Sequence, residues 1–275
     1  MAVSIGVVFA SMEQETQEIL SYLITYQNTL QKSFEFRLVS YPGDDPFLNL
    51  LQQKPGPNHD EAAAGAEDFA LRVKEFSALQ ADLYRLQTEQ IDKIVLLTNT
   101  RFADNYYYIG CPTWAIIALG NWHKDCAPPS IVEYYLNILV TAALDALGAG
   151  IGRHYLTRAC NFDFNASLRD KRLSVLAGNI CPDCVAKIEA KAGIEFVSDA
   201  LILLKMNWLG DSNTPSAVAS TVKKLGFDLF HTTGAKPSLR ERLLATFEQE
   251  GLKNLLSVTF QILLAIAVVV IGLKK

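Results

Sequence analysis

The chain has no surplus of positive charge and little cysteine. Its 25 Lys and Arg residues are outnumbered by 29 Asp and Glu residues, which gives a net charge of −4. A protein without a basic surplus offers no electrostatic footprint for a phosphate backbone, so we expect no nucleic-acid partner. Half of the 275 residues are hydrophobic and 20% are charged, which excludes a wholly disordered chain.

The N-terminus, Met1-Ala-Val-Ser-Ile-Gly, lacks the basic stretch and the cleavage site of a secretory signal. The five cysteines are an odd number. Both observations argue against a disulfide scaffold and favour metal binding for any clustered cysteines. Cys111 and Cys126 stand alone, and we expect small buried side chains there. His123 lies near Cys126, but nothing in the sequence orients the two as a catalytic pair.

One long hydrophobic run lies at the C-terminal end. Residues Leu255 to Leu273 are 19 residues without a charge, flanked by lysines, and 13 of them are Leu, Ile, Val or Phe. At about 1.5 Å per residue the run spans about 28 Å, against a hydrocarbon core of about 30 Å. A buried core helix is the alternative, but such helices rarely run so long without a polar stripe. We therefore expect residues 252–275 to form a single-pass tail anchor in the lipid bilayer, with the N-terminal domain in the cytoplasm, where thiolates stay reduced.

Hydrophobic patterns upstream predict an α/β fold with a mixed, mostly parallel sheet and helices on both faces. We expect strands at residues 3–10, 34–41, 94–98 and 114–119, and helices at residues 13–26, 61–90 and 130–147. The last helix begins with a capping box formed by Ser130 and Glu133. This domain is expected to span residues 1–190, followed by a helical connector at 191–251 and the anchor at 252–275.

A constellation with metal chemistry lies between His154 and Cys184. Cys181-Pro-Asp-Cys184 is a Cys-x2-Cys knuckle, and His154 and Cys160 precede it. Such a knuckle places two thiolates on a tight turn around one zinc ion, and a Cys and a His from an earlier loop can complete the tetrahedron. We predict a structural zinc held by His154, Cys160, Cys181 and Cys184. Unligated cysteines with a surface His154, or a redox pair, are the alternatives, although no thioredoxin-type strand-to-helix start precedes the pair.

The same segment resembles the second half of the archaemetzincin zinc peptidases. In that family a helix reading His-Glu-x-x-His-x-x-Gly-x-x-His is followed by Cys-x4-Cys-x-Met, a Ser-Leu stretch and Cys-Pro-x-Cys. This chain reads His154-Tyr-Leu-Thr-Arg-Ala-Cys160-Asn-Phe162, then Ser167-Leu168, then Cys181-Pro-Asp-Cys184. The resemblance extends over residues 3–187 and implies a metzincin-like fold.

The resemblance also implies that the catalytic zinc is lost. Counted back from His154, the other metal-binding histidines of the family correspond to Leu144 and Gly148, and its general base corresponds to Asp145. A catalytic zinc needs three protein ligands and an open position for water. One remaining histidine cannot hold that ion.

Two further departures concern the surroundings of the metals. Phe162 stands where the family has the Met below the catalytic metal, and Tyr155 replaces one thiolate of the family's second, structural zinc site. The replacement leaves the three cysteines of the constellation with a vacancy that His154 is near enough to fill. The implied protein has kept its structural zinc and lost its catalytic one.

Together these features predict a membrane-anchored, zinc-stabilised, non-catalytic pseudo-protease. We expect it to act as a sensor, adaptor or regulator in bacterial stress or phage defence, with a protein partner or a second copy of itself. One alternative is a membrane-anchored, metal-dependent peptidase that uses other residues, although no cluster of titratable groups in the sequence supports it. The other is a membrane-disrupting effector that is held back by its cytosolic domain.

Overall fold

The computed structural model describes residues 2–86, 90–120, 126, 128–155, 159–165, 168–227 and 229–233. Contacts within the chain define one compact unit over residues 1–235. The predicted anchor and the final part of the predicted connector lie outside the described residues, so the three-part division of the chain stays a prediction. Among the described helices none is long and apolar enough to cross a membrane.

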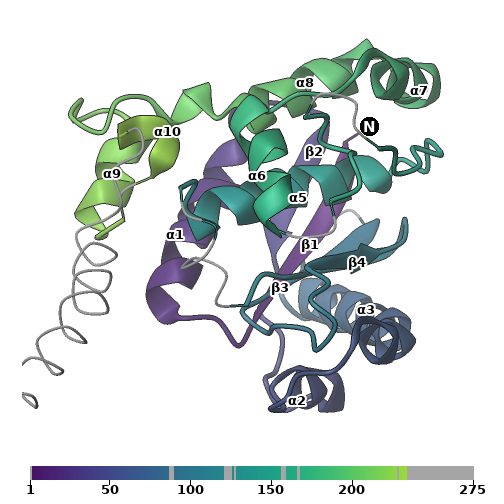
Figure 1. The fold of residues 1–275 in the computed structure, drawn as a ribbon. Coiled ribbons are helices and arrows are strands. Elements are labelled where there is room, and N and C mark those ends of the chain that lie inside the picture. The colour runs from purple at the N-terminus through teal and green to yellow at the C-terminus, as the bar shows by residue number, and fades with distance from the viewer. Residues whose placement is uncertain are drawn as a thin grey trace, which may run out of the picture. The chain divides into compact units, whose positions relative to one another are not determined.

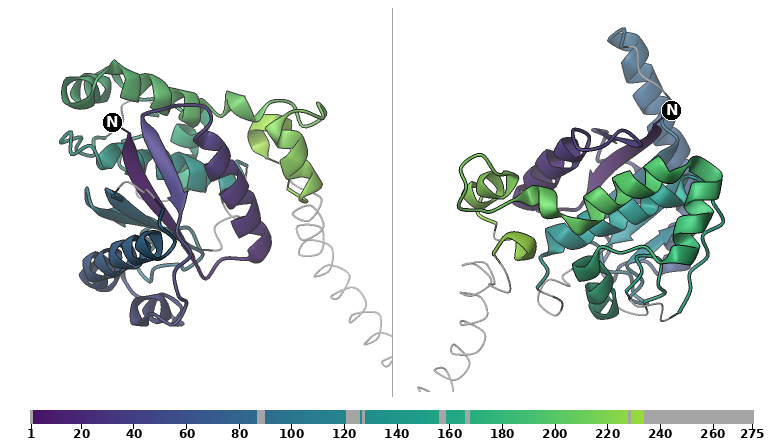
Figure 2. Two further views of the ribbon diagram at one scale, coloured as in Figure 1. Left: turned by 180° about the vertical axis from the view of Figure 1, so that it is seen from behind. Right: turned by 90° about the horizontal axis from the view of Figure 1, so that it is seen from above.

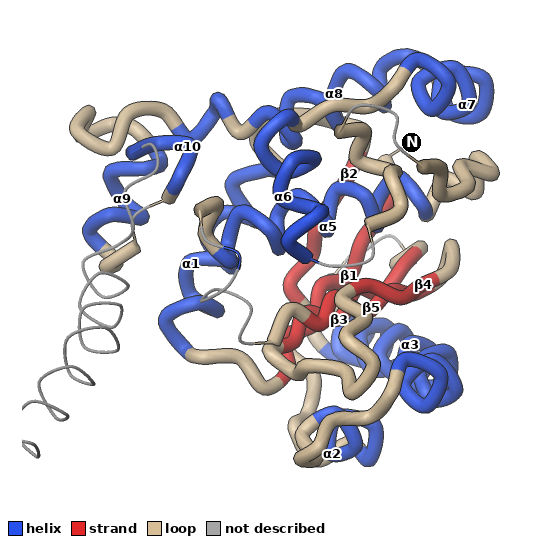
Figure 3. The backbone as a smooth tube through the Cα atoms, viewed as in Figure 1, coloured by secondary structure: helices blue, strands red, loops and turns tan. Residues whose placement is uncertain are grey.

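A five-stranded sheet lies at the centre, with the strand order β2-β1-β3-β5-β4 (Figure 1, Figure 3). Four strands are parallel, namely β1 (Val3–Ala10), β2 (Phe34–Leu38), β3 (Lys93–Thr98) and β5 (Trp114–Ala118). The edge strand β4 (Tyr108–Gly110) runs antiparallel to β5. All six residues of β3 are buried, as expected for a central parallel strand that is covered on both faces. The predicted mixed, mostly parallel sheet is confirmed.

Helices cover both faces of the sheet (Figure 1, Figure 2). One face packs against α2 (Pro46–Leu51) and α3 (His59–Leu83). The other packs against α1 (Gln14–Gln27) and α5 (Ile131–Asp145). Two helices pack on α5, namely α6 (Leu168–Ala177) and α8 (Ile194–Lys205). The helix α7 (Pro182–Ala192) packs against α8. The flanking helices predicted from the sequence are therefore present on both sides.

The helix α5 begins at the predicted capping box. The Ser130 backbone N–H donates to the Glu133 carboxylate at 2.8 Å, and the Glu133 N–H donates to the Ser130 hydroxyl at 3.4 Å. The same carboxylate accepts the backbone N–H groups of Phe230 at 2.9 Å and of His231 at 2.8 Å, and it pairs with the His231 ring. Burial raises the pKa of Glu133, but the contacts with His231 outweigh it and lower the pKa below its usual value. Glu133 thus joins α10 (Phe230–Thr233) to the start of α5.

The later helices pack into the same core. Val197, Leu203 and Leu204 of α8 are buried against α5, and Leu209 of the 3-10 turn η1 (Asn207–Leu209) is buried beside them. The Asp199 carboxylate of α8 accepts the backbone N–H groups of residues 32 and 33, at 3.1 and 3.0 Å, just before β2. A further helix, α9 (Val218–Lys224), follows.

Several elements differ from the sequence prediction for identifiable reasons. The aromatic stretch before β5 forms the separate edge strand β4, which is only three residues long and depends on pairing with β5. The helix α3 ends at Leu83 and not at Gln90, because Arg85 adopts a left-handed conformation with φ of 53°. The Leu86 N–H then donates to the Ala81 carbonyl at 2.8 Å, which closes the helix end in a Schellman-type turn.

Candidate metal centre and adjoining cleft

Four predicted metal ligands meet at one point of the fold. One donor atom from each of His154, Cys160, Cys181 and Cys184 lies within 4.8 Å of the others. The His154 Nε2 atom is 3.1 Å from the Cys184 sulfur and 3.5 Å from the Cys181 sulfur. In a tetrahedral zinc site, bonds of about 2.3 Å to sulfur and 2.0–2.1 Å to nitrogen place neighbouring ligand atoms about 3.5–3.8 Å apart. The donor set and its spacing fit one zinc ion with four protein ligands.

Two short bridges and one helix start deliver these ligands. His154 forms an isolated β-bridge with Asp163, and Cys160 forms another with Asn179. Cys181 is the N-cap residue of α7, and Cys184 lies in the first turn of that helix. The positive end of a helix dipole favours thiolates at this place. The knuckle seen in the sequence is therefore the beginning of a helix.

The His154 ring is oriented by a carboxylate. Its Nδ1 atom lies 2.8 Å from Oδ1 of Asp163, and its Nε2 atom faces the cysteine sulfurs. A carboxylate behind a ligating histidine fixes the ring tautomer and makes the other nitrogen a better ligand. Asp163 is thus a positioning residue for the metal centre, and the sequence spacing alone did not identify it.

Cys160 is prepared to act as a thiolate. A hydrogen bond from the Cys184 thiol lowers the pKa of Cys160 below its usual value, although burial opposes the shift. The backbone N–H groups of Cys181 at 3.2 Å and Phe162 at 3.5 Å also point at the Cys160 sulfur. Such N–H donors stabilise a negative sulfur. Of the remaining two cysteines, Cys126 is buried as expected. The expectation of a buried Cys111 is wrong, because its side chain is partly exposed in the cleft described next.

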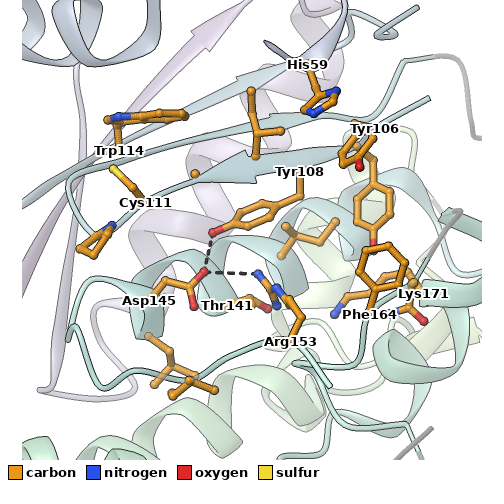
Figure 4. Close-up of a pocket in the computed structure, with 18 of the residues that line it drawn as sticks. His59, Tyr106, Tyr108, Cys111, Trp114, Thr141, Asp145, Arg153, Phe164 and Lys171 are labelled. Carbon is orange, nitrogen blue, oxygen red and sulfur yellow. Dashed lines mark hydrogen bonds and ion pairs between the residues drawn. The ribbon is translucent and has the colours of Figure 1, made fainter. Parts of the chain in front are cut away.

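A cleft of about 890 Å³ adjoins the metal centre (Figure 4). Its walls come from β4, from the C-terminal half of α5 and from the loops around residues 148–153 and 163–165. Leu144, Asp145 and Gly148, which the sequence resemblance assigns to the catalytic positions of the family, all line it. Within the described part of the chain, the only group of metal-ligating side chains is the His154 and cysteine cluster, which excludes these three positions.

The Asp145 carboxylate is engaged by two neighbours. Its Oδ2 atom accepts a hydrogen bond from the Tyr108 hydroxyl at 2.6 Å and faces the Arg153 guanidinium at 3.3 Å (Figure 4). Burial and the Asp145 charge raise the pKa of Tyr108, so Tyr108 stays a proton donor. The Arg153 guanidinium also lies over the rings of Tyr108 and Phe162, at 5.1 and 5.7 Å. The Asp145 carboxylate is therefore held in place by a hydrogen bond from Tyr108 and an ion pair with Arg153.

Two other residues that depart from the family pattern, Phe162 and Tyr155, lie in the core and on the surface, respectively. Phe162, at the position of the family's Met, is fully buried in the core. Tyr155 is 73% exposed and packs on Phe164, so its side chain lies on the surface. The His123 that precedes Cys126 lies outside the described residues.

No protein-family profile and no curated protein sequence matches the chain. The backbone is similar to those of two archaemetzincins. The archaemetzincin of Methanopyrus kandleri matches with a TM-score of 0.42 and 14% identity, over 69% of this chain and 95% of that one. The archaemetzincin of Archaeoglobus fulgidus, complexed with malonate, matches with a TM-score of 0.41 and 12% identity, over 67% and 99%. Both belong to the family that the sequence resembles, while the chemistry of the site rests on the residues of this chain.

We expect the purified protein, prepared without chelator, to contain one zinc ion per chain. Cys181→Ser should remove most of it, because three ligands hold zinc far less tightly than four. Metal binding contributes directly to folding free energy, so the melting temperature should fall by on the order of 10 °C. Elemental analysis and a thermal melt measure the two effects. Cys111→Ser, outside the cluster, is the matched control and should change neither; unchanged zinc in Cys181→Ser contradicts the predicted ligand set.

Proposed function

We propose that this chain is a membrane-anchored, zinc-stabilised, non-catalytic pseudo-protease that binds a ligand in its cleft and acts as a sensor, adaptor or regulator. The proposal rests on the residues at positions 144, 145 and 148, which line the cleft and are called the cleft floor. Leu144 and Gly148 offer no metal ligand at the positions where the family pattern has histidines, and Asp145 is held by Tyr108 and Arg153.

Without histidines at positions 144 and 148, the cleft cannot hold the zinc ion that would activate water for hydrolysis. A leucine side chain has no lone pair for a metal, and glycine has no side chain at all. A hydrolytic zinc lowers the pKa of bound water from about 15.7 to about 7, and water elsewhere is a poor nucleophile at neutral pH. Asp145 has a stem one methylene shorter than glutamate, and a misplacement of about 1 Å in a group that positions the attacking water costs about a hundredfold in rate.

The remaining metal centre suits a structural role. Four protein ligands close the coordination of zinc and leave no open position for water or substrate, which distinguishes structural from catalytic sites. All three cysteines are buried, and the centre joins the loop after α5 to the start of α7. We propose that zinc holds this side of the cleft in shape.

Anchoring rests on the hydrophobic run near the C-terminal end. The 19 uncharged residues from Leu255 to Leu273 support a single span, with the folded domain in the cytoplasm. A cytosolic binding domain joined to a membrane helix suits a sensor whose output is a contact with a protein partner or with a second copy. On this architecture we propose a role in bacterial stress or phage defence.

No peptide cleavage is expected from the zinc-loaded protein. The measurement is a screen of the wild type and of Asp145→Ala against a mixed peptide library, read by mass spectrometry with and without chelator. Because two of the metal ligands that hydrolysis needs are absent, both proteins should give no more cleaved peptide than a sample without protein. Chelator-sensitive cleavage that disappears in Asp145→Ala would falsify the non-catalytic proposal.

Removal of residues 252–275 should convert a membrane-bound protein into a soluble one. High-speed centrifugation without detergent should sediment the full chain with membranes and leave the shortened chain in the supernatant with its zinc. The full chain in the supernatant would contradict the anchor. Digestion of the domain by protease added to inside-out vesicles, but not to right-side-out vesicles, would support its cytoplasmic side, and the reverse pattern would contradict it.

A further inference from the structure

Lys171 is a buried cation at one end of the cleft. It belongs to α6, lines the cleft and is only 3% exposed. Its amine donates to the Asn161 backbone carbonyl at 2.7 Å and to the Asn161 side-chain oxygen at 2.9 Å. A lysine ammonium has three N–H groups. Among the described residues, one of them therefore remains for a further acceptor.

Arg153 is the second cation of the cleft and is held in place by aromatic rings. Its guanidinium lies 5.1 Å from the centre of the Tyr108 ring and 5.7 Å from that of Phe162, which restricts where the group can move. Its contact with Asp145, at 3.3 Å, is longer than the 2.6 Å contact that Tyr108 makes with the same oxygen. A guanidinium has five N–H donors, and one nitrogen makes this contact. Among the residues that the structure describes, Arg153 makes only this hydrogen bond, so its other donors can serve a ligand.

The two cations influence each other. Burial, and next the positive charge of Arg153, lower the pKa of Lys171 to about 7, so the amine is only partly protonated at neutral pH, and an anion bound beside it would favour the charged form. Figure 4 shows both side chains reaching into the same part of the cleft. Of the two carboxylates nearby, Asp145 is engaged by Tyr108, and Asp163 is engaged by His154 of the metal centre. An anion placed between the cations would relieve their repulsion and use the donors that remain.

Aromatic side chains form a large part of the remaining cleft wall. Tyr106, Tyr107, Trp114 and Phe164 line it together with Tyr108. A largely apolar cleft with a few convergent polar groups is the usual form of a small-molecule site, in which the apolar wall gives affinity and the polar groups give orientation.

We propose that the cleft binds a small organic anion, with its carboxylate between Arg153 and Lys171 and its apolar body against the aromatic wall. This inference rests on the proposed non-catalytic function and names the class of ligand that the protein senses. A carboxylate suits the planar fork of arginine. The fork suits a phosphate as well. Arg153 and Lys171 together carry at most two positive charges and Asp145 carries one negative charge, so a monoanion matches the net charge of the site, and we commit to the carboxylate.

The test compares probes that share a shape and differ in charge. Isothermal titration on the zinc-loaded full chain in nanodiscs uses 3-phenylpropionate, its amide, 3-phenylpropylamine and phenyl phosphate. The carboxylate should bind about tenfold or more tightly than the amide and the amine. Arg153→Gln and Lys171→Met should each remove most of this preference. Arg37→Gln, on the surface of β2 and outside the cleft, is the matched control and should retain it.

Further variants keep the result interpretable. Lys171 donates to Asn161, so its variant can fail to fold; Arg153→Gln carries the test in that case. Asp145→Asn removes the competing carboxylate and should tighten carboxylate binding. Tighter binding of phenyl phosphate, lost in Arg153→Gln, would support the anion site and assign it to a phosphate.

Equal binding of acid and amide, tightest binding of the amine, no binding of any probe, or a preference unchanged in Arg153→Gln overturns the inference. If the protein also cleaves no peptide, any one of these outcomes contradicts the anion site alone. Peptide cleavage, by contrast, contradicts the proposed function itself.

Discussion

Complete burial of α5 is the constraint on which the rest of the structure depends. Every residue from Val132 to Leu144 is buried between the sheet and the helices packed over it. Its first turn contains Glu133, whose carboxylate accepts hydrogen bonds from the backbone at the start of α10. Near its other end, the Thr141 hydroxyl accepts a hydrogen bond from the side chain of Asn161, the residue after the ligand Cys160. Lys171 donates to the same asparagine. One core helix, α5, therefore positions both the cleft floor and the segment that carries His154 and Cys160.

A zinc ion held by the four predicted ligands would give the segment between α5 and α6 a cohesion that regular structure does not supply. The described residues between α5 and α6 are turns and isolated bridges, and fixing one such residue costs about 1–2 kcal/mol of backbone entropy. A metal bound by all four ligands would join two residues of this segment, His154 and Cys160, to two residues at the start of α7. In this account zinc shapes one wall of the cleft, and the aromatic residues and the two cations of the cleft determine what binds there.

Sequence patterns located the elements whose burial is visible in their own residues. The strands β1 and β3 and the helices α1 and α5 have strong apolar patterns, and the structure has all four. The short edge strand β4 and the polar helix α6 owe their existence to neighbours, so no local period marks them. The ligand set follows from spacing, because the four residues lie in one segment of the chain. Tyr108 and Lys171 come from separate elements that only the folded chain brings to Arg153 and Asp145. No spacing in the sequence connects them.

The central claim is that the chain binds its metal in a closed site of one histidine and three cysteines, beside a cleft that holds none. Zinc K-edge X-ray absorption on the protein as purified tests this most directly. The account predicts three sulfur atoms at about 2.3 Å and one nitrogen at about 2.0–2.1 Å. Coordination by nitrogen and oxygen atoms with a bound water, and without sulfur, would contradict it, because that environment belongs to a catalytic zinc in the cleft.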